Sequence, residues 1–260
     1  MYKYYNKVFV ICLLITMTDD PTLKKTSRII SKVLSPAAKV WLLGLVSSVQ
    51  ELSVKIEGSD RQILKGYIPK VFLAATGAVY QDLHLSDLRF TGENIRINLG
   101  QVLKGKPLQL LEPISVSGNL VETEADLQMS LSSSLLSTAL TDLLGTLLEA
   151  AGTPNANATL KSYIIEWQSV TIGQANASDQ ITLTGTLTDP TGKIAPAIVR
   201  TGLQLASPYQ LKLFPLHLEV PDPTGDITEF LIDLGTDVKI EQLAIAPGQL
   251  TCQGQLKVIP

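Results

Sequence analysis

The segment from Asp82 to Leu99, DLHLSDLRFTGENIRINL, alternates apolar and polar residues, but the alternation shifts by one residue twice. The alternating groups are Leu83 and Leu85, then Leu88 and Phe90, then Ile95, Ile97 and Leu99. Alternation predicts a half-buried β-strand. A shift of one residue, here called a phase slip, turns every later side chain to the other face unless a β-bulge absorbs it. The segment therefore predicts a long strand with bulges.

Phase slips recur towards the C-terminus, in the segments 211–220 and 238–245. Gly92, Gly185 and Gly254 lie inside strand-like segments, where glycine marks a bulge or a bend. We therefore expect a long, strongly curved antiparallel sheet that wraps around something, either a helix, an apolar ligand or both. An ordinary β-sandwich is the alternative, because bulges are also common at sheet edges.

The segment from Ser132 to Gly152 predicts an amphipathic, leucine-rich helix that ends at Gly152 and Pro154. A helix is also expected after Thr123, which has capping-box spacing to Asp126. A further short helix is expected from Asp226 to Gly235. The fold class is therefore α+β, with the curved sheet wrapped around the leucine-rich helix.

Residues 1–21 are expected to form an N-terminal extension or a weak signal or anchor, and residues 22–260 a single domain. Lys3 and Lys7 precede a short apolar run of signal-peptide size, but no good cleavage site follows it. Met17 is an alternative start, which would place the protein in the cytoplasm, peripheral to a membrane. If the run is a signal, the protein is exported or anchored by its N-terminus.

A basic helical segment follows, with five cations and no acid from Lys24 to Lys39. The whole chain carries −3, which leaves −8 for the remainder. One interpretation is an amphipathic helix packed on the body with a solvated lysine face. The other is a helix that rests on an anionic membrane, where each cation contributes up to ~1 kcal/mol. The expected membrane contacts are Lys24, Lys25, Arg28, Lys32 and Trp41.

Motifs for catalysis and cofactor binding are missing from the sequence. It has no glycine-rich phosphate loop, no Gly-x-Ser-x-Gly turn and no His-Glu-x-x-His helix. The only histidines, His84 and His217, lie in alternating runs, and Cys12 and Cys252 have no metal-binding spacing. A pI near 5.5 disfavours nucleic acid. We expect no enzyme activity, no cofactor, no metal and no nucleic-acid partner.

Residues 52–131 resemble the LmeA-like phospholipid-binding family, in particular its branch from photosynthetic bacteria. The resemblance is carried by VKIEGSDRQILKGYIPKV, GENIRINLGQVLKGKPL and TEADL, and the order of elements fits more loosely to Pro260. The family implies a fold similar to tubular lipid-binding proteins, in which a curved antiparallel sheet wraps around a helix and leaves a cavity for acyl chains.

We therefore expect a phospholipid-binding protein without enzyme activity, which transfers lipid or maintains a membrane or envelope and prefers anionic lipid. The alternatives are an envelope structural or assembly protein with no ligand and, third, a lipid-modifying enzyme that uses a histidine. From periodicity, the expected cavity residues are Phe72, Phe90, Ile95, Ile97, Leu136, Leu140, Leu143, Leu147 and Trp167.

Overall fold

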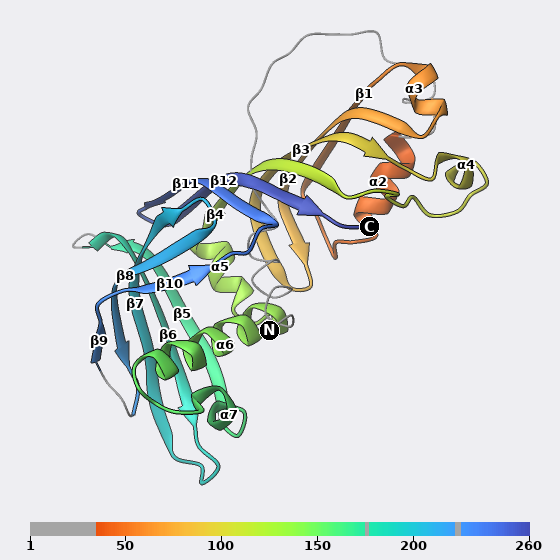
Figure 1. Ribbon diagram of the computed structural model, residues 1–260. Coiled ribbons are helices and arrows are strands. Elements are labelled where there is room, and N and C mark those ends of the chain that lie inside the picture. The colour runs from red at the N-terminus through yellow and green to blue at the C-terminus, as the bar shows by residue number, and fades with distance from the viewer. Residues whose placement is uncertain (1–34, 175–176, 222–224) are drawn as a thin grey trace.

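The computed structural model describes residues 35–174, 177–221 and 225–260, which form two open antiparallel sheets and several helices (Figure 1). The first sheet has the order β1 (Glu51–Glu57), β2 (Tyr67–Tyr80), β3 (Leu83–Arg96), β4 (Ile114–Thr123), β12 (Gln249–Val258) and β11 (Val238–Ala246). The second has the order β10 (Phe230–Asp233), β8 (Gln210–Glu219), β7 (Ile194–Ser207), β6 (Ala177–Thr188) and β5 (Ile164–Gln174), and β9 (Gly225–Ile227) pairs with β8. The α+β class with antiparallel sheets is confirmed.

The described helices lie at both ends of the elongated molecule and at its centre (Figure 1). They are α2 (Ser35–Leu43), α3 (Asp60–Leu64), α4 (Leu99–Val102), α5 (Glu124–Ser130), α6 (Ser134–Ala150) and α7 (Ala156–Leu160). The predicted leucine-rich helix is confirmed as α6, which Ser133 caps by accepting a 3.3 Å hydrogen bond from Leu135 N. Thr123 is confirmed as the N-cap of α5, because its side chain accepts a hydrogen bond from Asp126 N.

The helix expected from Asp226 is wrong, because this segment forms β9 and β10 instead. In β10, Phe230 and Ile232 pack against the core, whereas Leu231 between them is 47% exposed. That is the two-residue period of a strand. Pairing of all four β10 residues with β8 outweighs the helix-like start and stop residues of the sequence.

The phase slips in the 82–99 segment are present in β3, but no bulge absorbs them. The register of β2 and β3 is unbroken from Tyr67↔Arg96 to Tyr80↔Leu83. At two places, next to Gly77 (φ +55°) and Asn94 (φ +56°), the alternation of buried and exposed side chains shifts by one residue in both strands at once. Because the partner strand slips at the same point, apolar residues stay opposite one another on one face. This face, which carries Leu73 and Phe90, is called the inner face.

The other two predicted phase slips are bulges. The register of β7 and β8 shifts between Thr201 and Leu203, and that of β11 and β12 shifts between Ile240 and Gln242. A glycine faces each bulge, since a Cβ at Gly202 would meet Phe214 O and one at Gly254 would meet Lys239 O. Glycine therefore lets the bulged backbone approach its neighbour closely.

The core is divided into two clusters. The larger one joins α6, the second sheet and the half of the first sheet that lies next to the second sheet. The smaller one lies at the opposite end of the first sheet, here called its distal end, and consists of Ile56, Ile63, Ile68, Ile95, Ile97, Leu99 and Ile114. The inner face of the first sheet therefore packs into the larger cluster at one end and forms the smaller cluster at the other.

Helix α5 ties the two sheets together by binding the free edge of β5. Gln128 Nε2 donates to Gln168 O at 2.7 Å, and Gln128 Oε1 accepts from Val170 N at 2.9 Å. Glu124 Oε2 accepts from Ile172 N at 2.7 Å. These side chains satisfy backbone groups that an edge strand would otherwise leave unpaired.

Candidate functional site

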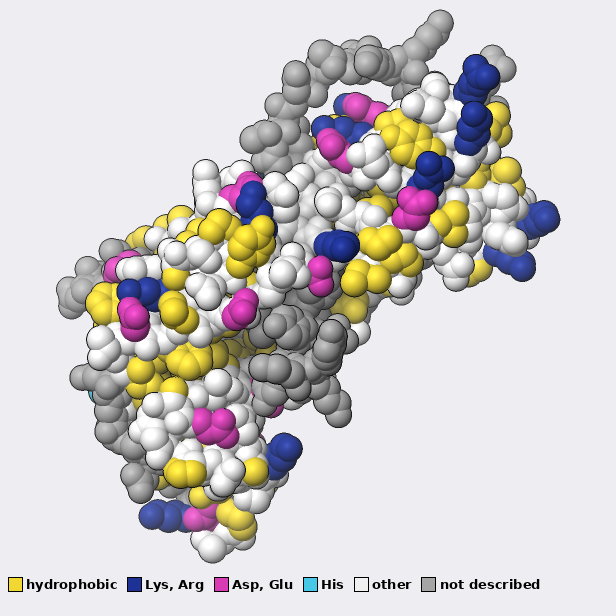
Figure 2. Space-filling view, in the orientation of Figure 1, with side chains coloured by type: hydrophobic (Ala, Val, Ile, Leu, Met, Phe, Trp, Pro, Cys, Tyr) yellow, Lys and Arg dark blue, Asp and Glu magenta, His cyan; other side chains and the backbone are white. Residues whose placement is uncertain are grey.

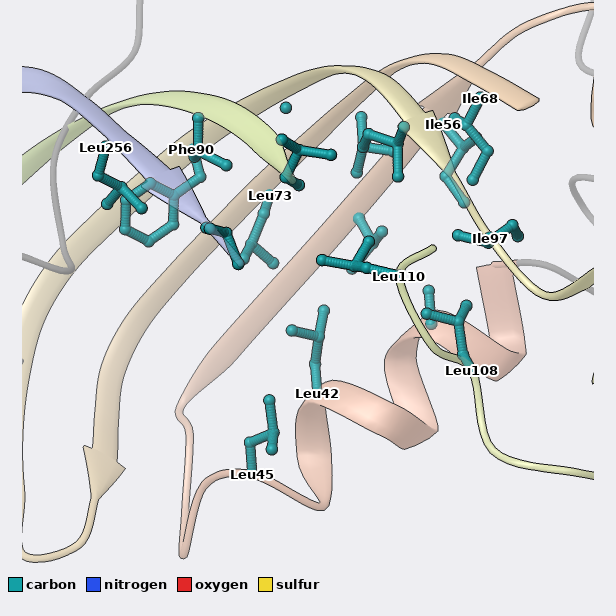
Figure 3. Close-up of a pocket in the computed structure, with 18 residues that line it drawn as sticks. Leu42, Leu45, Ile56, Ile68, Leu73, Phe90, Ile97, Leu108, Leu110 and Leu256 are labelled. Carbon is teal, nitrogen blue, oxygen red and sulfur yellow. The ribbon is translucent and has the colours of Figure 1, made fainter. Parts of the chain in front are cut away.

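An apolar pocket lies on the inner face of the first sheet at its distal end, with a cavity volume of about 280 Å³ (Figure 3). Strands supply most of its wall, namely Val54, Ile56, Ile68, Val71, Leu73, Phe90, Gly92, Ile95, Ile114, Val116, Leu256 and Val258. The remainder comes from α2 and from connecting segments, namely Ala38, Leu42, Leu45, Ile97, Leu108 and Leu110. Every lining residue is apolar.

The slip at Asn94 positions the strand wall of the pocket. It brings Ile95 to the inner face opposite Ile68, three residues after Gly92 rather than two. Gly92 forms part of the wall between Val71 on β2 and Val116 on β4, its register partners. Because Gly92 has no side chain, Ile95 and Ile114 can approach it, and a Cβ at Gly92 would lie 3.1 Å from Ile95 Cδ1 and 3.8 Å from Ile114 Cδ1.

Helix α2 and the 98–111 loop close the pocket on the side away from the sheet. Leu42 and Leu45 face the strands, and Leu108 and Leu110 approach from the loop (Figure 3). Asn98 holds this loop, because its Nδ2 donates to Pro107 O at 3.0 Å and its Oδ1 accepts from Gln109 N at 2.8 Å. Leu110 therefore points into the pocket, while Leu111 is 57% exposed.

Charged groups of these strands lie on the outer face of the sheet instead. Lys55 pairs with Glu57 at 3.2 Å, and Lys70 pairs with Glu93 at 2.9 Å. Both lysines also lie over the Phe72 ring, at 5.2 and 5.1 Å from its centroid. The pocket wall carries no titratable group, so it can hold an apolar chain but supplies no nucleophile, acid or base.

The structure brings three of the predicted cavity residues together. Phe90, Ile95 and Ile97 all line the pocket. Phe72 does not, because it lies one residue out of phase with Val71 and Leu73 and faces the outer side with the two lysines. Whether the three lining residues contact lipid stays a prediction.

The other predicted cavity residues belong to the larger core cluster, not to the pocket. Leu136 and Leu147 are buried there, Leu140 and Leu143 are partly buried and pack against this cluster, and Trp167 is 8% exposed. The Trp167 indole N–H has no hydrogen-bond partner among the described residues. In this structure the five side chains pack α6 and β5 into the body.

The predicted membrane contacts Lys24, Lys25, Arg28 and Lys32 lie outside the described residues. Trp41 belongs to α2, the helix that covers the pocket. The predicted extension of residues 1–21 also lies outside the described residues. These expectations stay predictions.

Sequence reasoning missed the residues that cover the pocket, chiefly Leu42, Leu45, Leu108 and Leu110. A signal for the last two was present, since Leu108 and Leu110 alternate within KPLQLLEP. Two apolar residues alone are too short a pattern to predict a pocket wall.

Among the described residues, no cluster of His, Cys, Asp or Glu has the geometry of a metal site. No single helix in the described ranges is long and apolar enough to cross a membrane. Helices α5 and α6 reach that length and apolar content only when taken together, and they meet at 91°.

Comparison with protein families gives one match over most of the chain. Residues 25–255 match the model of the family described as LmeA-like phospholipid-binding. No significant match is found among curated proteins or among solved structures. The family match includes every strand, with β12 up to residue 255, and all residues that line the pocket except Leu256 and Val258. The chain therefore belongs to the LmeA-like phospholipid-binding family.

Proposed function

We propose that the protein binds phospholipid without enzyme activity by holding part of an acyl chain in the pocket between α2 and the first sheet. The observation that carries this proposal is the wall of that pocket, in which all 18 residues are apolar. A polar headgroup finds no partner on such a wall and stays outside, in contact with solvent or membrane. Family membership supports the same ligand class.

The size of the pocket suits part of a chain rather than a whole lipid. Its 280 Å³ is nearly twice the ~150 Å³ of an engineered apolar cavity that binds benzene. Each buried methylene contributes about 0.8 kcal/mol. Several methylenes therefore provide useful affinity, and the rest of the chain lies along the apolar margin at Leu42 and Leu45.

The lack of titratable groups in the wall supports binding rather than catalysis. We propose that the protein transfers lipid or maintains a membrane, as a peripheral protein that meets anionic phospholipid. The basic segment that starts at Lys24 supports this proposal, because cations near an anionic surface are attracted to it. A sheet that wraps around a helix, as in tubular lipid-binding domains, is part of this proposal.

The pocket is tested by filling it from the wall at Gly92. In Gly92→Leu, the new Cβ would lie 3.1 Å from Ile95 Cδ1, the movable end of a side chain, and no backbone atom is that close. The leucine should occupy the chain site without breaking the strand. Phospholipid bound to the purified protein is measured by mass spectrometry, and we expect the variant to retain much less than the parent.

The matched control is Ser115→Leu, which adds the same side chain to an exposed position of the neighbouring strand β4. It should retain lipid like the parent, and circular dichroism should show that both variants are folded. Equal lipid in Gly92→Leu and Ser115→Leu would mean that the lipid lies elsewhere. A parent protein that carries no lipid and takes up none from labelled vesicles would favour a structural protein without a ligand.

A further inference from the structure

The distal end of the first sheet carries a second surface feature, a shallow hollow outside the pocket. Its lining includes Leu64 and Lys65 at the end of α3, Lys104 after α4, and Leu111. Two backbone hydrogen bonds hold these segments together, from Ile97 N to Gly66 O at 2.9 Å and from Leu111 N to Arg96 O at 2.9 Å. Residues far apart in the sequence therefore form one built surface.

Large apolar side chains project from this end into solvent. Leu64 is 61% exposed, Leu103 is 56% exposed and Leu111 is 57% exposed. A single exposed leucine needs no explanation. Here Leu64 and Leu111 line one hollow from two segments, and Leu103 precedes Lys104 of the same lining, so the exposed leucines are grouped. Their burial against a partner would remove apolar surface from water.

Cations surround these leucines. Arg61 of α3 and Lys65, the C-cap residue of that helix, lie one turn apart, and Lys104 and Lys106 flank Gly105 in the 98–111 loop. Figure 2 shows Lys and Arg side chains gathered with apolar side chains at the end where α3 and α4 lie. All four cations are exposed, and none forms an ion pair with another described residue.

The charge here opposes that of the whole chain. Segments 60–66 and 99–111 contain these four cations and one acid, Asp60, whereas the whole chain carries −3. The surface is therefore locally positive on an acidic protein. Cations interleaved with exposed leucines complement an anionic lipid surface, which offers phosphate at its boundary and hydrocarbon beneath it.

We propose that this distal tip, defined as Arg61, Leu64, Lys65, Leu103, Lys104, Lys106 and Leu111, docks on the surface of an anionic membrane. The leucines enter the headgroup boundary, and the cations lie against lipid phosphates. This goes beyond the proposed lipid pocket and does not depend on it, because no residue of the tip lines that pocket.

Docking by the tip would also bring the pocket to the membrane. Ile97 lines both the hollow and the pocket, and the 98–111 loop lies between them. In this loop Leu108 and Leu110 face the pocket, while Leu103 and Leu111 face solvent. A contact that moves the loop would therefore act directly on the cover of the pocket.

The test uses the full chain and co-sedimentation with vesicles of phosphatidylcholine, with and without phosphatidylglycerol. In Lys104→Gln/Lys106→Gln, we expect binding to the anionic vesicles to fall by about tenfold, with neutral vesicles unaffected. The loss should shrink as salt rises, because surface charges are screened over ~8 Å at physiological ionic strength. In Leu103→Ser/Leu111→Ser, binding to both vesicles should weaken while the anionic preference remains.

Matched controls come from the far end of the second sheet, where Lys161, Lys193, Ile164 and Ile194 are also exposed. Lys161→Gln/Lys193→Gln and Ile164→Ser/Ile194→Ser should bind vesicles like the parent. If the tip variants bind like these controls, the tip proposal is wrong.

A second comparison separates the tip from the N-terminal basic segment. If Lys24→Gln, Lys25→Gln, Arg28→Gln and Lys32→Gln together abolish binding while the tip variants retain it, that segment is the contact and the tip proposal falls. Bound lipid is measured separately by mass spectrometry. Loss of vesicle binding in the tip variants with bound lipid unchanged supports the tip, and a parent without bound lipid overturns only the pocket.

Discussion

At the scale of single residues, Glu122 is the strongest exception to the apolar interior. It is 5% exposed and points to the inner side of β4, like Leu120 two residues earlier. Burial raises the pKa of its carboxyl to about 8, against the effect of a 3.2 Å hydrogen bond from Ser86 N, and the nearby Asp126 raises it further. Glu122 is therefore protonated in the native protein at neutral pH.

This proton makes stability depend on pH. The carboxyl has an ordinary pKa of 4.5 when the chain is unfolded, so between pH 4.5 and 8 the native state binds one more proton than the unfolded state. The free energy of unfolding should therefore fall as pH rises through this window, by up to ~1.4 kcal/mol per unit. Glu122→Gln should remove this contribution and be more stable than the parent at pH 8 by up to about 4–5 kcal/mol, which is what this slope reaches over the whole window.

Urea unfolding at several pH values measures the effect. Glu166→Gln, which replaces an exposed carboxylate on β5, is the control and should keep the slope of the parent. A slope that persists in Glu122→Gln would assign the pH dependence to other groups.

At the scale of elements, the phase slips show what a sequence can and cannot specify. The pattern of Leu85, Leu88 and Ile95 locates both places where β3 turns over. It does not distinguish a bulge from a twist shared by two strands, because that depends on the partner, and β2 slips at the same points. Local patterns also failed at Asp226, where pairing with β8 overrides helix signals.

The glycines opposite the bulges provide a test at this scale. A Cβ at Gly254 would collide with Lys239 O and lie 2.9 Å from Ile240 Cα, and backbone atoms cannot move aside as a side chain can. Gly254→Ala should therefore lower the free energy of unfolding by about 1–3 kcal/mol. Gly100→Ala, which meets nothing within 4 Å, should not destabilise the protein. Equal stability of the two variants would show that the β11 bulge is not held by close packing.

At the scale of the whole molecule, the apolar residues are divided between a packed core shared by both sheets and a pocket at one end of the first sheet, and the sequence does not reveal this division. Leu136 in α6 and Ile95 in β3 are both strongly patterned apolar residues, but one lies in a packed core and the other in a pocket wall. Periodicity identifies which side of an element is buried. It does not say whether another side chain fills the space opposite, which depends on long-range contacts such as α2 with β1.

This division leads to a test of what α6 does. Leu147 is fully buried in the larger cluster and is absent from the pocket wall, so Leu147→Ala should leave a cavity and cost about 2–5 kcal/mol in the free energy of unfolding. Phospholipid bound per folded molecule should stay at the level of the parent. Gly92→Leu should do the opposite, with less lipid and little loss of stability. If Leu147→Ala also lowers lipid per folded molecule, α6 lines the lipid site, as a sheet wrapped around a helix and a ligand would require.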